Sequence, residues 1–246
     1  RRRKRRRLRR RFIGRRRSLR ELVNMINAEK QFTQADREQI AQRIAELETH
    51  TDAEVVCAVA TESGRYDRAE SVCGLLIGVA ALILAQQWDS PGDWNAPPAL
   101  PIGGQVLLIA VGFLAGSLLA SYWHGLRRLF VTRDEMQTEV HRRVHQVFSQ
   151  QGIGNTRHNG GLLIYVSLFE HRLEIHCDSA AAGKLTPENL ATIRDAVLVS
   201  IKSGHFTAGL LAGLDAAEPI LAAALPHTDH GLDTLQNDLL VFHHRP

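Results

Sequence analysis

Two long runs without charged residues dominate the hydrophobic pattern of the chain. Ser71–Trp88 contains 18 uncharged residues, and Leu100–Trp123 contains 24. A helix that crosses a membrane needs about 20 mostly apolar residues. Neither run has the polar face that is typical of a helix at the surface of a soluble domain. The pattern therefore predicts a hairpin of two transmembrane helices, and two buried helices of a soluble core are the alternative.

Small residues in these runs predict how the two helices meet. Gly74 and Gly78 lie four residues apart in the first run, and Gly112 and Gly116 have the same spacing in the second. Glycines four residues apart allow two helix backbones to approach closely in lipid. We therefore expect these four glycines to form the packing surface between the two membrane helices.

The charges beside the runs predict their orientation. The loop 89–99 contains two Asp and no Lys or Arg. The opposite flanks carry Arg65, Arg68, Arg127, Arg128 and Arg133. Because positive charge is retained in the cytoplasm, we expect an integral membrane protein with two spans and both termini cytoplasmic. A bacterial inner membrane would suit this topology.

The rest of the chain follows the patterns of a mixed α/β domain. The expected helices are Phe32–Thr49, Asp134–Gln150, Thr186–Gly204 and Phe206–Ala224, and the expected strands are Glu54–Ala60, Leu162–Ser167 and Arg172–Cys177. The last two strands are close enough in sequence to pair antiparallel. A single strand before the hairpin cannot fold alone, so it must join the strands that follow the hairpin. The membrane hairpin is therefore predicted to be an insertion within one α/β domain.

This pattern predicts five segments. They are an Arg-rich N-terminal tail at 1–31, the first part of the α/β domain at 32–66, the transmembrane hairpin at 71–123, the second part of the domain at 127–226, and a polar C-terminal tail at 227–246. The three cysteines are an odd number without metal-ligand spacing, and we expect buried free thiols.

A resemblance to a known family is carried by N-G-G-L-L-I-Y-V-S-L-F-E-H-R-L-E-I at Asn159–Ile175. It extends to Gly152–Arg157, Ala53–Val56 and Gly204–Leu210. These residues resemble the TPM-domain family. The resemblance implies a small α/β/α sandwich that is often tethered to a membrane. Members include thylakoid proteins linked to photosystem II maintenance and a receptor accessory protein, and some have been assigned acid phosphatase activity with a divalent-metal site.

The residues that would carry such an activity are incomplete here. Where the family has a glycine-rich turn with an acidic residue, Asp178–Leu185 reads D-S-A-A-A-G-K-L. Asp178 and Glu188 are the nearby carboxylates and thus the weak candidates for a metal site. Ca²⁺ or Mg²⁺ would suit them, but two carboxylates do not make a complete site for a hard cation. We therefore expect no catalytic residue and no bound cofactor.

Two further features have a structural and a functional interpretation. Asn159 and Gly160 precede a strand and predict a tight turn with positive φ, while the alternative is the mouth of a pocket lined by backbone. His141 and His145 lie one helical turn apart and could share a transition metal. Because no third ligand is identifiable and two arginines lie between them, a solvated helix face is the favoured interpretation.

The charge is strongly asymmetric along the chain. Residues 1–17 contain 13 basic residues and no acid, whereas the other 229 residues carry 17 basic and 26 acidic residues. The basic residues are Arg1, Arg2, Arg3, Lys4, Arg5, Arg6, Arg7, Arg9, Arg10, Arg11, Arg15, Arg16 and Arg17. We expect this tail to bind an anionic lipid surface or an acidic partner. A solvated tail and a nucleic-acid arm are less favoured alternatives.

These observations together favour a binding protein over an enzyme. We expect a membrane-anchored TPM-like protein that serves as an accessory subunit or as an assembly or maintenance factor of a larger membrane protein complex. The alternative is a divalent-metal-dependent acid phosphatase.

Overall fold

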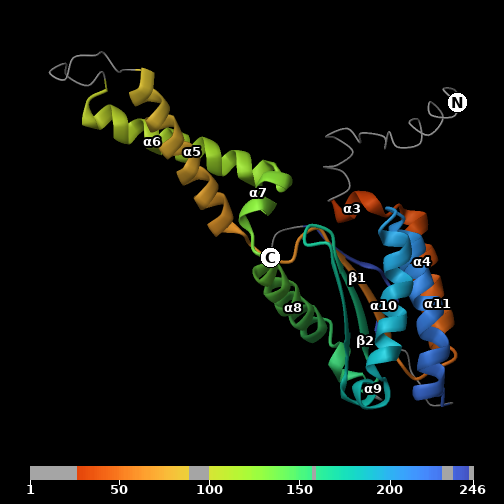
Figure 1. Ribbon diagram of the computed structural model, residues 1–246. Helices are drawn as coiled ribbons and strands as arrows, with labels where there is room; N and C mark the ends of the chain where they lie inside the picture. Colours follow the sequence, from red (N-terminus) through yellow and green to blue (C-terminus); the bar gives the residue numbers. More distant parts are fainter. Residues whose placement is uncertain (1–26, 89–99, 157–158, 229–234, 244–246) are drawn as a thin grey trace, which may run out of the picture. The chain divides into compact units, whose positions relative to one another are not determined.

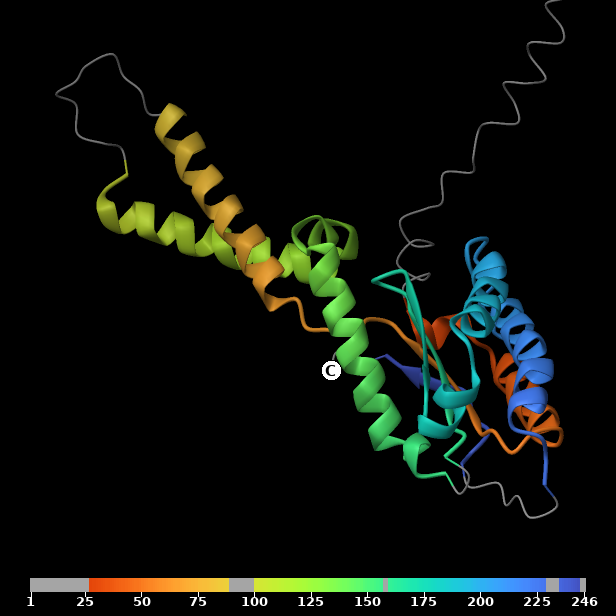
Figure 2. The same cartoon turned by 60° about the horizontal axis from the view of Figure 1, so that its bottom comes forward.

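The computed structural model describes residues 27–88, 100–156, 159–228 and 235–243 of the 246-residue chain. Its contacts divide the chain into two compact units. The first unit combines the residues up to Glu62 with those from Val144 onward, and the second unit is Ser63–Arg143. Figures 1 and 2 show the sheet and helices of the first unit and the helices of the second.

The first unit contains a four-stranded sheet. Its strands are β1 (Val55–Ala60), β2 (Leu162–Ser167), β3 (Arg172–Cys177) and β4 (Leu240–Phe242), in the order β3-β2-β1-β4. β1 runs parallel to β2 and β4, while β2 and β3 are antiparallel. β1 and β2 pair although the two long apolar runs separate them in the sequence, and Val55 lies opposite Leu162. This pairing confirms the prediction. The predicted mixed α/β class is also confirmed.

Three helices cover one side of this sheet. They are α4 (Gln34–Glu48), α10 (Pro187–Ile201) and α11 (Phe206–Ala224) (Figures 1 and 2). Alternate strand residues pack into the core beneath them: Val55, Cys57 and Val59 of β1 and Leu162, Ile164 and Val166 of β2. This alternation follows from the two-residue period of a strand. The intervening residues of both strands are buried as well, so β1 and β2 are covered on both faces.

The predicted helix starts are present in the first unit. The hydroxyl oxygen of Thr33 accepts a hydrogen bond from the Asp36 backbone N–H at 3.2 Å. That of Thr186 accepts one from the Asn189 N–H at 3.3 Å. Both helices therefore begin with a side chain that satisfies a free backbone donor. Beyond the end of α10, Gly204 has a φ of +88°, which favours glycine.

α11 is one of three helices that are long and apolar enough to cross a membrane, together with α5 and α6 of the second unit. Its buried residues are Gly209, Leu210, Gly213, Leu214, Ala217 and Leu221, and they form part of the core against α4 and α10. Its polar side is also occupied, because Arg43 of α4 forms ion pairs with Asp215 and Glu218. The Arg43 guanidinium holds the pKa of Glu218 below its usual value. α11 is thus apolar because it is a core helix.

The second unit contains three helices and the first part of a fourth. α5 (Asp67–Trp88) and α6 (Ile102–Tyr122) correspond to the two apolar runs. α7 (His124–Phe130) follows α6 directly and was not predicted from the sequence. α8 (Arg133–Gln150) begins in this unit and ends in the first, where Val144 and Val147 are buried.

The C-terminal segment corrects an expectation. Residues 227–246 were expected to form a polar, poorly packed tail, but β4 lies within them and Leu239 is buried in the core. Three shorter elements were also missed: α3 (Ala28–Gln31), the 3-10 helix Ile153–Asn155 and α9 (Ser179–Lys184). α9 occupies the position where an irregular turn was expected.

The cysteines are free thiols, as predicted. Cys57 and Cys73 are buried, whereas Cys177 is half-buried. Burial, assisted by the charge of Glu48, raises the pKa of the Cys57 thiol to about 12. Burial alone raises that of Cys177 to about 11. Neither thiol is therefore activated as a nucleophile at neutral pH.

Candidate functional site

The turn before β2 contains the residues that carry the family resemblance. Asn159 has a φ of +51°, as predicted for a tight turn, whereas Gly160 does not have positive φ. A Cβ at Gly160 would lie 3.2 Å from the backbone oxygen of Asp52, and one at Gly161 would lie 2.1 Å from that of Ile153. The second distance is too short for any side chain. These glycines therefore allow close backbone approach, and the structural interpretation explains them.

Asp178 follows β3 and begins the next helix. Its Oδ1 accepts a hydrogen bond from the Ser179 N–H at 2.6 Å and so caps α9. Its Oδ2 is buried and has no hydrogen-bond partner within the part of the chain that the structure describes. The Asp178 N–H donates to the Gly161 oxygen at 2.8 Å, which ties α9 to the turn before β2.

Glu188, the other candidate metal ligand, serves a different helix. It lies in the first turn of α10, where its own backbone N–H and the Thr186 hydroxyl lower its pKa. Both candidate carboxylates thus act at helix N-termini, where negative charge is stabilising. Over the described ranges, no three His, Cys, Asp or Glu side chains are placed to share a metal ion.

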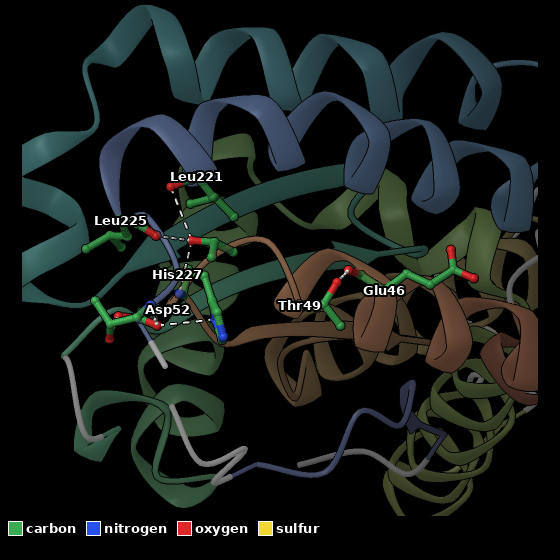
Figure 3. A network of polar contacts seen from close by, with 9 residues as sticks. Glu46, Thr49, Asp52, Leu221, Leu225 and His227 are labelled. Atoms are coloured by element: carbon green, nitrogen blue, oxygen red, sulfur yellow. Dashed lines mark hydrogen bonds and ion pairs between the residues drawn. The ribbon is translucent and has the colours of Figure 1, made fainter. Parts of the chain in front are cut away.

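A second polar network closes the end of α11 beside the start of β1 (Figure 3). The Thr51 hydroxyl donates to the Leu225 backbone oxygen at 2.5 Å. Asp52 accepts hydrogen bonds from the N–H of Thr228 at 2.9 Å and from its hydroxyl at 2.6 Å. The Nδ1 of His227 lies 3.4 Å from the same carboxylate. The network satisfies a free carbonyl at the helix end, so its role is structural.

Buried polar side chains also gather at the carboxyl ends of the parallel strands. They are Thr61 and Glu62 after β1 and Ser167 and Glu170 at the end of β2, and each is at most 6% exposed. The Ser167 hydroxyl donates to the Glu170 carboxylate. The Oγ1 of Thr61 lies 3.3 Å from the Nδ1 of His243. In open α/β sheets, ligands bind outside the carboxyl ends of the strands, so this is the favoured edge for a binding site.

Sequence reasoning did not find this group. Each member is a common polar residue next to an apolar strand, and only the sheet topology brings the strand ends together. The order β2-β1-β4 was the missing information, because β4 delivers His243 beside Thr61.

His145, one of the two histidines that lie one turn apart on α8, packs against His176 of β3. The ring centroid of His145 lies 4.4 Å from that of His176 on β3, and Phe148 packs edge-on against His176 at 4.7 Å. The structure thus places His145 in an aromatic cluster on the sheet rather than on a fully solvated face. Edge-on ring packing is a stabilising arrangement in its own right.

In the second unit, α5 and α6 meet at the four glycines. A Cβ at Gly112 would lie 2.7 Å from the Cα of Gly78, and one at Gly116 would lie 2.8 Å from that of Gly74. Real Cβ atoms are essentially never this close to backbone atoms. Only glycine therefore permits the observed approach of the two helices.

The base of this helix pair contains a buried ion pair. Arg127 of α7 is completely buried, and its Nη1 donates to the Glu70 Oε1 of α5 at 3.2 Å. Its guanidinium carbon lies 5.8 Å from the ring centre of Tyr66. The Ser117 hydroxyl of α6 donates to the Glu70 backbone oxygen at 3.3 Å. Glu70 therefore connects α5 with both α6 and α7.

The predicted anionic-surface residues at 1–17 lie outside the described residues, as does the loop 89–99.

The fold and these sites define an α/β domain joined to a pair of long apolar helices. Residues 124–219 match the family model of the TPM domain, which confirms the resemblance over this part of the chain. The fold is similar to the NMR structure of the BA42 protein from the psychrophilic bacterium Bizionia argentinensis. The TM-score is 0.52 at 17% identity over 85% of this chain and 94% of that one, which is a likeness of fold. No curated protein matches the chain.

Proposed function

We propose that α5 and α6 anchor the protein in a membrane and that the TPM domain serves as a binding module. The protein would act as an accessory subunit or as an assembly or maintenance factor of a membrane protein complex. The observation that carries this proposal is the apolar outer surface of the two helices. Their exposed residues include Leu75, Leu76, Ile83 and Leu84 of α5 and Val106, Leu107, Leu114 and Leu118 of α6.

Such a surface is unfavourable in water. Soluble proteins rarely expose a large continuous apolar area unless it is covered by a partner or a lipid. Large apolar side chains recur along α5 and α6 at exposures of 40–80% between Val72 and Leu118. Burying this surface in the hydrocarbon of a membrane removes the unfavourable contact between apolar side chains and water. α11 is not proposed to enter the membrane, because its apolar side already packs in the core.

Binding is favoured over catalysis because the candidate carboxylates have structural roles. Asp178 caps α9 and Glu188 lies in the first turn of α10. We also propose that the basic segment 1–17 binds an anionic lipid surface near the membrane. Each basic residue near such a surface contributes about 1 kcal/mol, so thirteen of them would bind strongly at low salt.

Cysteine labelling tests the proposed topology. In intact cells, an impermeant maleimide should label the Ser90→Cys variant, because loop 89–99 would face outward. The His227→Cys variant should be labelled only after permeabilisation, because the TPM domain would be cytoplasmic. The unsubstituted chain is the control for its three native cysteines. Labelling of His227→Cys in intact cells would contradict the proposed orientation.

A phosphatase assay separates the two functions. The purified full chain should hydrolyse a chromogenic phosphate ester no faster than buffer, with saturating Ca²⁺ or Mg²⁺ and across pH 4–8. The phosphatase alternative instead predicts metal-dependent turnover that is lost in Asp178→Asn, with Asp195→Asn as an exposed-carboxylate control on α10. Turnover with that mutational pattern would overturn the binding proposal.

A further inference from the structure

The two edges of β1 are paired to different extents: the inner edge faces β2, and the outer edge faces β4. β1 is fully buried, and β2 pairs with it at all six positions from Val55 to Ala60. On the other side, β4 pairs with it only at Ala58–Ala60. Half of the outer edge is therefore covered by a three-residue segment from the C-terminal part of the chain.

A side chain occupies the start of the other half of this edge. The Val55 N–H donates to the Glu48 Oε1 at 2.8 Å, so a carboxylate occupies the position that a strand carbonyl would take. An unpaired strand edge is a template for an added strand, and proteins commonly block it with charge. Glu48 thus limits strand addition to the carboxyl-terminal half of β1, where β4 lies.

β4 shows which chemistry this edge accepts. Leu239 is buried in the core, and Val241, two residues later, packs against it. The Phe242 oxygen accepts the Thr61 N–H at 2.9 Å, and the His243 ring lies beside the Thr61 hydroxyl. The edge therefore accepts a parallel strand with apolar residues at alternate positions, followed by a polar side chain.

β4 is also the most readily removed strand. It has three residues, all half-buried, whereas β1 and β2 have six buried residues each. Edge segments with few buried contacts open locally at a lower free energy than central strands. Opening of β4 would leave the paired β1 and β2 intact.

We infer that the outer edge of β1 is a binding site for an extended apolar segment of a partner protein, and that β4 occupies it in the free protein. The inference rests on the proposed binding function and specifies its surface. The partner segment would replace β4 as a parallel strand, with affinity from main-chain hydrogen bonds and specificity from the two apolar positions. β4 belongs to the same chain and therefore competes with the partner segment for the outer edge of β1. The partner binds only when its segment displaces β4.

A peptide-binding experiment on the full chain in nonionic detergent tests this inference. The probe is a fluorescent peptide with the sequence of residues 235–243. The Val241→Asp variant should bind it, because the charge removes β4 from the core. Wild type should bind at least about tenfold more weakly, because a tethered segment competes at an effective concentration in the millimolar range. Val199→Asp adds the same charge at a position that is 73% exposed and should behave like wild type.

Two results would overturn the inference. One is a folded Val241→Asp variant, judged by circular dichroism, that binds no peptide. The other is equal binding by wild type and variant, which would place the peptide elsewhere. A dimeric wild type in light scattering that becomes monomeric in Val241→Asp would identify the occupant as β4 of a second copy and would overturn the partner assignment.

Hydrogen exchange of wild type tests the inference without any variant. The Thr61 amide, which bonds to β4, should exchange at least about tenfold faster than the Leu162 amide, which bonds to Glu54 at 2.8 Å. Equal rates would mean that β4 leaves only when the domain unfolds. Peptide binding and hydrogen exchange do not depend on membrane topology. A negative result in either would therefore not contradict the proposed topology, and a negative labelling result would not contradict the inference about β4.

Discussion

Replacement of Glu70 by glutamine should lower the free energy of unfolding by about 3–5 kcal/mol. Arg127 is completely buried, and its guanidinium donates to the Glu70 carboxylate at 3.2 Å. Removing one partner of a buried ion pair leaves a charge in a medium that solvates it poorly. Thermal unfolding of the full chain in nonionic detergent, followed by circular dichroism, measures the effect.

An exposed ion pair on the same helix provides the matched control. Asp67 lies 3.2 Å from Arg65, and both side chains are more than half exposed. Asp67→Asn should therefore cost about 0–1 kcal/mol. The double variant Glu70→Leu with Arg127→Met should recover most of the loss, because both charges of the pair are replaced by apolar side chains. An equal effect of Glu70→Gln and Asp67→Asn would show that the Glu70 pair is not buried.

Replacement of Gly112 by isoleucine should destabilise the α5–α6 pair by about 3 kcal/mol, the upper range for overpacking. The added Cβ would lie 2.7 Å from the Cα of Gly78. Because this neighbour is backbone, no side-chain rotation relieves the clash and the helices must separate. A cysteine pair placed across α5 and α6 should then crosslink more slowly in the variant than in the parent.

Gly103→Ile is the control on the same helix. No atom lies within 4 Å of a Cβ at Gly103, so the same side chain meets no obstacle there. Crosslinking and melting temperature should both stay close to the parent values. If Gly112→Ile behaved like Gly103→Ile, the close approach of the two helices at this position would be wrong.

The parts of the fold that sequence predicted best are those with long, uniform patterns. β1 and β2 are uninterrupted apolar runs, and a single strand cannot be stable alone, so their pairing across about 100 residues could be deduced. The start of α10 was equally clear, because Thr186 and Pro187 form a strong local signal. Such features depend on neighbours in sequence.

The parts that sequence missed depend on distant partners. β4 is three apolar residues within a polar segment, and only the free edge of β1 gives them a structure. Arg127 was interpreted as a flanking charge because its position beside an apolar run suggested that role. Its partner Glu70 lies 57 residues away, which no local pattern reveals.

One miss was avoidable. The residues Ser179–Lys184 contain three consecutive alanines, the residue with the highest helix propensity, after an aspartate that is a preferred N-cap. The family's glycine-rich turn predicts an irregular connection at this position, whereas the local residues favour the helix α9. The group of polar side chains around Thr61 could not be predicted from the sequence, because it forms only when β2, β1 and β4 are aligned in the sheet.

The parallel pairing of β1 with β2 has a consequence for synthesis of the protein. β1 leaves the ribosome about 100 residues before the strand that completes its hydrogen bonds. At about 5–20 residues per second, this apolar strand waits roughly 5–20 s without its partner. During that interval, the translocon would be inserting the proposed membrane helices. With the proposed topology, sheet closure would occur only after insertion had left both halves in the same compartment, so the order of translation would couple membrane integration to domain folding.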